Sequence, residues 1–234
     1  MASRARTDTE LKTMSTHSAA MLSFQHAYRP GAGPWTLLLL HGTGGDEHDL
    51  VPLGRQLAPQ AALLSPRGRV LEAGMPRFFR RHASGQLDIP DLIERTDELA
   101  EFVRAATREY GRDPGRIVAL GFSNGANIAV SLLLRHPPLL RGAALLRPLL
   151  PYEPTAAPKL THTDVLIAAG EGDPYSTPGQ TRRLAEILAE GGAEVTVHTA
   201  PHAGHNLTQS DLTETARWFQ TLIGPEPATS GNDR

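Results

Sequence analysis

A serine, an aspartate and a histidine occupy three short glycine-containing segments that lie far apart in the chain. The segments are Gly121-Phe-Ser-Asn-Gly125, Gly170-Glu-Gly-Asp-Pro174 and Gly204-His205. A serine hydroxyl attacks a carbonyl carbon only when a base takes its proton, and that base needs a third group to orient it. These residue types predict that Ser123 is a nucleophile, that His205 is its base and that Asp173 is the acid that orients the imidazole.

The residues on either side of Ser123 favour this interpretation. Residues 116–120, of which the last four are apolar, are expected to form a buried strand, and residues 126–135 are expected to form a helix. A serine on a sharp strand-to-helix turn has a strained backbone and an exposed hydroxyl. The G-x-S-x-G pattern alone is weak, because a structural serine in a tight turn would show it too. The strand before it and the helix after it give it weight.

The acid and the base follow strands in the same way. An apolar strand is expected over residues 165–169 and an alternating strand over residues 194–199, before the segments that hold Asp173 and His205. Loops that follow parallel strands gather at one edge of the sheet. The chain order of serine, acid and histidine is that of the α/β-hydrolase fold. We therefore expect the three side chains to converge at that edge.

Hydrolysis through a serine also needs two N–H donors for the oxygen that becomes negatively charged. Asn124, directly after the serine, supplies one backbone N–H. We expect the second from Thr43, in the glycine-rich loop over residues 41–46 that follows an apolar strand. The glycines of this loop allow its backbone to turn an N–H inward.

The elements that must position these residues alternate along the chain. Strands are expected over residues 35–40, 61–65, 116–120, 142–146, 165–169 and 194–199, with a weak edge strand over 21–28, and helices over 50–57, 89–110, 126–135, 177–190 and 212–223. This alternation predicts an α/β fold with a mostly parallel central sheet and helices on both faces. We expect flexible tails over residues 1–20 and 225–234, and one α/β-hydrolase domain over residues 21–224.

Two irregular stretches bear on the substrate. The segment of about eighteen residues between Leu146 and Val165 is too short for a helical lid domain, so we expect an open site for small esters. Residues 66–87 lack a regular pattern, and Met75, Phe78 and Phe79 are candidate substrate-binding residues there. Core packing is an equal alternative for the two phenylalanines.

Composition excludes several other kinds of protein. The net charge of −2 gives no sign of nucleic-acid binding, and the absence of cysteine excludes disulfides and thiolate chemistry. The longest aliphatic run, over residues 37–40, is too short to span a membrane, and no secretory signal is visible. We therefore expect a cytoplasmic protein.

The motifs together resemble the phospholipase/carboxylesterase family of α/β-hydrolases. The resemblance lies in Leu39-Leu-His-Gly-Thr-Gly-Gly-Asp46, Ser65-Pro-Arg-Gly68 and the three segments of the serine, the acid and the histidine. It implies a cytosolic serine esterase that acts on short to medium acyl esters without a cofactor, with a small-molecule ester as its partner. In this family Ser123, Asp173 and His205 correspond to the nucleophile, acid and base. One departure is Thr43, where many relatives have leucine.

Alternative assignments remain for several of these residues. Glu171 is the only local rival of Asp173, and spacing alone does not separate His205 from His202, although the preceding Gly204 and the resemblance favour His205. A metal site at His41, Asp46, His48 and Asp49 is not favoured, because no helical ligand pattern is present. Arg77, Arg80 and Arg81 are most simply a solvated surface, with binding of an acidic ester as the alternative.

The same motifs also leave alternatives at the level of function. A thioesterase or a lysophospholipase would use the same triad. A peptidase would typically need an added domain, and a non-catalytic binding protein would have lost members of the triad. A homodimer is among the assemblies that the sequence leaves open.

Overall fold

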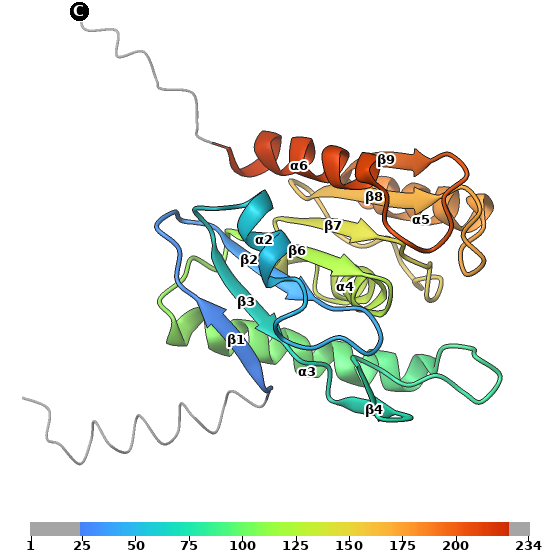
Figure 1. Ribbon diagram of the computed structural model, residues 1–234, viewed down its shortest axis with the longest axis horizontal. Helices are drawn as coiled ribbons and strands as arrows, with labels where there is room; N and C mark the ends of the chain where they lie inside the picture. Colours follow the sequence, from blue (N-terminus) through green and yellow to red (C-terminus); the bar gives the residue numbers. More distant parts are fainter. Residues whose placement is uncertain (1–23, 225–234) are drawn as a thin grey trace, which may run out of the picture.

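The computed structural model describes residues 24–224, which form a seven-stranded sheet (Figure 1). Its strands, in spatial order, are β1 (His26–Arg29), β3 (Ala62–Pro66), β2 (Thr36–Leu40), β6 (Ile117–Phe122), β7 (Gly142–Leu146), β8 (Asp164–Gly170) and β9 (Glu194–Ala200). Only β1 runs antiparallel to its neighbour. The predicted α/β architecture with a mostly parallel sheet is confirmed, and so is the edge position of the first strand.

Helices cover both faces of this sheet, as predicted (Figure 1). The helices are α2 (Val51–Leu57), α3 (Ile89–Glu109), α4 (Asn124–Arg135), α5 (Pro178–Glu190) and α6 (Gln209–Ile223), with a short 3₁₀ helix, η1 (Pro137–Leu139). One face carries α2 and α6, and the other carries α3, α4 and α5. No helix within residues 24–224 combines the length and the apolar character needed to cross a bilayer.

The sheet divides the hydrophobic core into two parts, one on each face, because successive side chains of a strand point to opposite faces. Leu37 and Leu39 of β2 pack with Phe219 of α6, whereas Leu38 and Leu40 pack on the side of α3 and α4. All five residues of β2 are buried. The continuous apolar runs of the sequence are thus explained by a sheet that is covered on both faces.

The segment over residues 66–87 is more regular than its sequence indicates. It contains a two-stranded hairpin of β4 (Val70–Glu72) and β5 (Met75–Arg77). The turn consists of Ala73 and Gly74, both with positive φ, as in the turns that match the twist of a hairpin. Strands of three residues are too short to show the alternation that identifies a strand. The tails predicted over residues 1–20 and 225–234 lie outside the described residues.

A buried carboxylate joins the loops that follow β2 and β3. Glu47 is 5% exposed and accepts hydrogen bonds from Arg67 Nε at 2.5 Å and from Gln25 Nε2 at 2.9 Å. Burial alone would raise the pKa of Glu47, but these hydrogen bonds lower it from 4.5 to about 2. The interaction therefore stabilises the folded chain while the carboxylate is ionised.

We predict that Glu47→Gln lowers the free energy of unfolding at pH 7 by about 1–2 kcal/mol, because the charged hydrogen bonds with Arg67 are lost. The folded-state pKa lies below the unfolded one, so the wild-type advantage is complete above about 4.5 and disappears as the pH falls toward about 2. Urea unfolding of both proteins between pH 7 and pH 3 measures this difference. Glu101→Gln, on the exposed side of α3, is the matched control, and a pH-independent difference would contradict the assignment to Glu47.

Candidate active site

Ser123 lies at the turn between β6 and α4 and has a strained backbone, with φ of 52° and ψ of −113°. Positive φ is rare for a residue with a side chain and costs free energy. The flanking glycines permit the turn: a Cβ on Gly121 would meet the backbone of Gly125 and Ala126, and one on Gly125 would meet the carbonyl of Leu40. The strain is thus imposed by close approach of helix and strand, which holds the hydroxyl in one position.

The structure brings the three predicted side chains into one hydrogen-bonded chain. His205 Nε2 lies 2.8 Å from Ser123 Oγ, and His205 Nδ1 lies 2.9 Å from Asp173 Oδ2. The other carboxylate oxygen of Asp173 accepts from the backbone N–H of Tyr175 at 2.9 Å. Because a carboxylate only accepts, Nδ1 must carry the imidazole proton, which leaves Nε2 free to accept from the serine hydroxyl.

The two rival residues lie outside this chain of contacts. The imidazole of His202 is 96% exposed, and its Nδ1 is 3.7 Å from Glu171 Oε2. Glu171 also accepts a hydrogen bond from the backbone N–H of His202 at 2.9 Å. The two rivals therefore interact with each other at the surface, whereas Asp173 contacts His205 and His205 contacts Ser123.

The two predicted N–H donors are available beside the serine. Among the described residues, no acceptor pairs with the backbone N–H of Thr43 or of Asn124. The side chain of Asn124 is 1% exposed, and its Oδ1 accepts from the backbone N–H of Phe78 at 2.7 Å. This contact holds the start of α4 against the segment after β5. An N–H group without a partner, whether at the start of α4 or in the loop after β2, can donate to a negatively charged oxygen.

The loop that carries Thr43 is held by a buried histidine and a buried arginine. His41 Nδ1 contacts the carbonyl of Gly42 at 2.6 Å, and Nε2 accepts from the backbone N–H of Gly68 at 2.9 Å. Burial lowers the pKa of His41, and the hydrogen bond with Gly42 offsets this shift only partly. The imidazole is therefore neutral, and both of its nitrogens form hydrogen bonds. Arg77 Nη1 donates to Thr43 Oγ1 at 2.5 Å. Within residues 24–224, no group of three acidic or histidine side chains could hold a metal ion.

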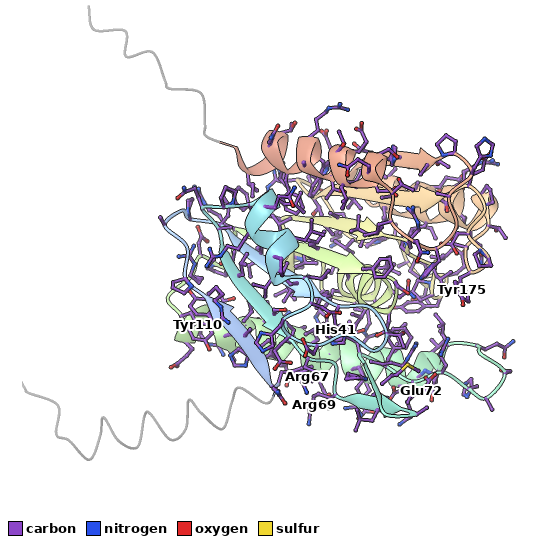
Figure 2. The ribbon with its side chains drawn as sticks, viewed as in Figure 1. His41, Arg67, Arg69, Glu72, Tyr110 and Tyr175 are labelled. Atoms are coloured by element: carbon purple, nitrogen blue, oxygen red, sulfur yellow. The ribbon has the colours of Figure 1, made fainter. Side chains whose placement is uncertain are left out.

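A cavity of about 320 Å³ opens in front of Ser123 and His205. It is lined by Thr43, Arg77, Arg81, Gly85, Leu87, Phe122, Ser123, Asn124, Asn127, Arg147, Leu149, Tyr175 and His205. The rings of Phe122 and Tyr175 both lie near the imidazole of His205, with centroids 5.6 Å and 4.8 Å from its own. Figure 2 shows Tyr175 at the end of the sheet toward which β6, β7 and β8 point, and Glu72 on the hairpin of β4 and β5.

The three residues predicted to bind substrate do not line this cavity. Phe78 and Phe79 are 2% and 0% exposed and belong to the core on the side of α3 and α4. Met75 is 41% exposed on the hairpin, where its side chain lies near Gly44. The phenylalanines reach the site through their backbone: Phe78 donates to Asn124, and the carbonyl of Phe79 accepts from Arg77 Nε at 3.1 Å.

An arginine that the sequence interpretation did not identify fixes the loop of His205. Arg147 follows β7 and is 1% exposed. Its Nε donates to the carbonyl of Gly204 at 3.0 Å, and its Nη2 donates to the carbonyl of Asn206 at 2.9 Å. The guanidinium thus holds the residues on both sides of His205. In an arginine-rich sequence, no local pattern distinguishes Arg147 from a surface residue.

The charge of Arg147 is neutralised by Asp211, at the start of α6. The two side chains are both 0% exposed and form two hydrogen bonds of 3.0 and 2.6 Å. Burial would raise the pKa of Asp211, but hydrogen bonds from Arg147 and Thr208 lower it below its ordinary value. Asp211 also accepts from the backbone N–H of Thr208, so one carboxylate caps α6 and pairs with Arg147.

The chain is similar in sequence and in fold to several known proteins. The family model for phospholipase/carboxylesterase matches residues 32–223. The protein "Putative hydrolase MhqD" of Bacillus subtilis is 43% identical over 199 residues, which are 85% of this chain and 99% of that protein. The crystal structure of a Bacillus cereus carboxylesterase superposes with a TM-score of 0.84 at 41% identity, covering 89% of this chain and 99% of that one. Acyl-protein thioesterase 1 of Mycosarcoma maydis is 25% identical over 240 residues, covering 90% and 99% of the two chains.

We predict that Asp211→Asn lowers the free energy of unfolding by about 3 kcal/mol, because it leaves the charge of Arg147 buried without a counter-ion. Urea unfolding at pH 7 measures the change. Glu214→Gln, on the same helix and paired with the exposed Arg217, is the control and should change the value by less than about 0.5 kcal/mol. Equal effects of the two substitutions would show that the buried pair does not hold α6 to the sheet.

Proposed function

Because the chain belongs to the phospholipase/carboxylesterase family of α/β-hydrolases, we propose that it hydrolyses small carboxylic esters through an acyl-enzyme on Ser123. The single observation that carries this proposal is the hydrogen-bonded chain from Ser123 through His205 to Asp173, with contacts of 2.8 and 2.9 Å. Serine, base and acid in this arrangement convert a weakly nucleophilic hydroxyl into a reactive one.

In the first half of the proposed reaction, Ser123 Oγ attacks the ester carbonyl while its proton moves to His205 Nε2. The imidazolium that forms is stabilised by Asp173, which accepts from Nδ1. The carbonyl oxygen becomes negatively charged and receives hydrogen bonds from the N–H groups of Thr43 and Asn124. The tetrahedral intermediate then loses the alcohol, which takes the proton from Nε2, and the acyl group remains on Ser123.

In the second half, water takes the place of the alcohol. His205 Nε2 removes a proton from water, and the hydroxyl oxygen attacks the acyl carbonyl carbon. The same two N–H groups bind the carbonyl oxygen as it becomes negatively charged. Collapse of this intermediate returns the proton to Ser123 Oγ and releases the carboxylic acid. The mechanism uses the residues of the chain alone and consumes one water per ester.

The cavity limits the size of the proposed substrate. Its volume of about 320 Å³ lies at the lower end of small-molecule sites. Residues 147–163, between β7 and β8, contain no helix or strand that could cover a long acyl chain. These features favour short, water-soluble esters.

A thioester is the second candidate substrate, because the relative from Mycosarcoma maydis is named an acyl-protein thioesterase. The same serine, histidine and N–H donors would act on the carbonyl of a thioester. An oxygen ester and a thioester with the same short acyl group, compared by kcat/KM, separate the two functions.

We predict that Ser123→Ala abolishes hydrolysis of p-nitrophenyl acetate and labelling by a fluorophosphonate probe, because the proposed acyl-enzyme forms on the Ser123 hydroxyl. His205→Ala should lower kcat by about 10⁶-fold and Asp173→Asn by about 10⁴-fold. The matched controls are His202→Ala and Glu171→Gln, which should retain wild-type activity since both residues lie outside the hydrogen-bonded chain. Wild-type rates in Ser123→Ala would overturn the proposal.

We also predict that kcat/KM for p-nitrophenyl esters falls as the acyl chain grows from four to twelve carbons, because the cavity is small. A decrease of at least about 10-fold is expected across this series. Steady-state kinetics with monomeric substrates measure it. A preference for emulsified long-chain triglycerides would contradict the assignment of an open site for small esters.

A further inference from the structure

Two arginines in the wall of the candidate active site share one carboxylate. We propose that Arg77 and Arg81 form an anion subsite, so that preferred esters carry a carboxylate in the part of the molecule that lies against this wall. The proposal rests on the proposed esterase function and specifies its substrate class. It concerns short half-esters of dicarboxylic acids, or small esters with an equivalent anionic group.

The charge around the cavity is the first argument. Its lining contains three arginines and no aspartate or glutamate. Arg147 is neutralised by the buried Asp211, with which it forms two hydrogen bonds. Arg77 and Arg81 have only Glu72 as a shared acidic partner among the described residues. One positive charge at the cavity wall is therefore left without a counter-ion.

The hydrogen bonds of the two guanidinium groups are the second argument. Arg81 binds Glu72 Oε1 through Nε at 3.1 Å and through Nη2 at 2.6 Å. Arg77 Nε lies 3.2 Å from Glu72 Oε2, but its single proton is donated to the carbonyl of Phe79. Within the described residues, Nη2 of Arg77 and Nη1 of Arg81 make no hydrogen bond. These N–H groups are the donors that a bound carboxylate would use.

Burial makes this site selective for charge. The side chain of Arg77 is 4% exposed, and that of Arg81 is 33% exposed, so water screens the first only weakly. Burial and the neighbouring Arg81 lower the pKa of Arg77, and Glu72 partly offsets this shift. An anion in the cavity would neutralise the excess positive charge of Arg77 and Arg81. A neutral acyl chain would leave that charge without a counter-ion.

The position of Arg77 connects the subsite to the reacting carbonyl. Its Nη1 holds Thr43 Oγ1, and Thr43 supplies one of the proposed oxyanion donors. Arg77, Arg81 and Ser123 line the same cavity of about 320 Å³. A carboxylate bound by the arginines must therefore lie within a few bonds of the ester, as it does in half-esters of succinic or glutaric acid.

The first test compares two substrates of similar size on the wild-type protein: mono-p-nitrophenyl glutarate, which is anionic, and p-nitrophenyl valerate, which is neutral. We expect kcat/KM to be at least about 10-fold higher for the glutarate at low ionic strength, and we expect this ratio to fall as NaCl is raised to 0.5 M. A ratio of one or less would overturn the proposal.

The second test measures the same ratio in variants of one residue. Arg81→Gln should lower the glutarate-to-valerate ratio by about 10-fold, and Arg81→Lys should keep most of it, because lysine retains the positive charge. The matched control is Arg80→Gln. Arg80 is the neighbouring arginine, it pairs with Asp88 and Asp91, and it does not line the cavity, so the wild-type ratio should remain.

The outcomes separate this proposal from the esterase function. If fluorophosphonate labels Ser123 and the valerate is hydrolysed without preference for the glutarate, the esterase function stands and the anion subsite is wrong. If neither substrate is hydrolysed and Ser123 is not labelled, the esterase function itself fails. If Arg81→Gln does not fold, the wild-type ratio and its salt dependence decide.

Discussion

The ion pair between Arg147 and Asp211 holds together three parts of the chain whose relative positions matter for the proposed reaction. It connects the end of β7, the loop of His205 and the first turn of α6, and both side chains are fully buried. A guanidinium has five donors in a fixed plane, so it can bind two loop carbonyls and a carboxylate at once. Because a buried charge without a partner is costly, the loop cannot shift without loss of free energy. The position of His205 therefore depends on hydrogen bonds from Arg147, which lies outside the histidine loop.

A second set of buried polar contacts supports the opposite side of the site. Neutral His41 ties the loop of Thr43 to Gly68, and Glu47 with Arg67 joins the loops after β2 and β3. Arg77 then reaches Thr43 from the hairpin. The proposed nucleophile thus lies between two sets of buried hydrogen bonds. One set is made by Arg147 and the other by His41. An oxyanion site requires N–H donors that are already held in position when the negative charge develops, and these contacts hold the loop of Thr43.

The sequence predicted the parts of this arrangement that depend on local rules. Apolar runs identified the buried strands, and the glycines around Ser123 indicated the sharp turn that the structure contains. Chain order and strand ends predicted the three side chains that lie within hydrogen-bond distance. The rest depends on long-range contacts. Arg147 is a charged residue without a pattern, the hairpin strands are too short to show alternation, and Phe78 and Phe79 differ from pocket residues only by burial in the folded chain.

The placement of Asp211 at the start of the last described helix has a consequence for the newly made chain. A ribosome releases β6 and the serine turn well before it releases α6, which begins at Gln209. Until α6 docks, Arg147 has no counter-ion and the carbonyls beside His205 have no firm anchor. We therefore expect reactivity to be acquired late in biogenesis, when the final amphipathic segment closes over the sheet. A partly synthesised chain would contain the serine turn but would not yet hydrolyse esters.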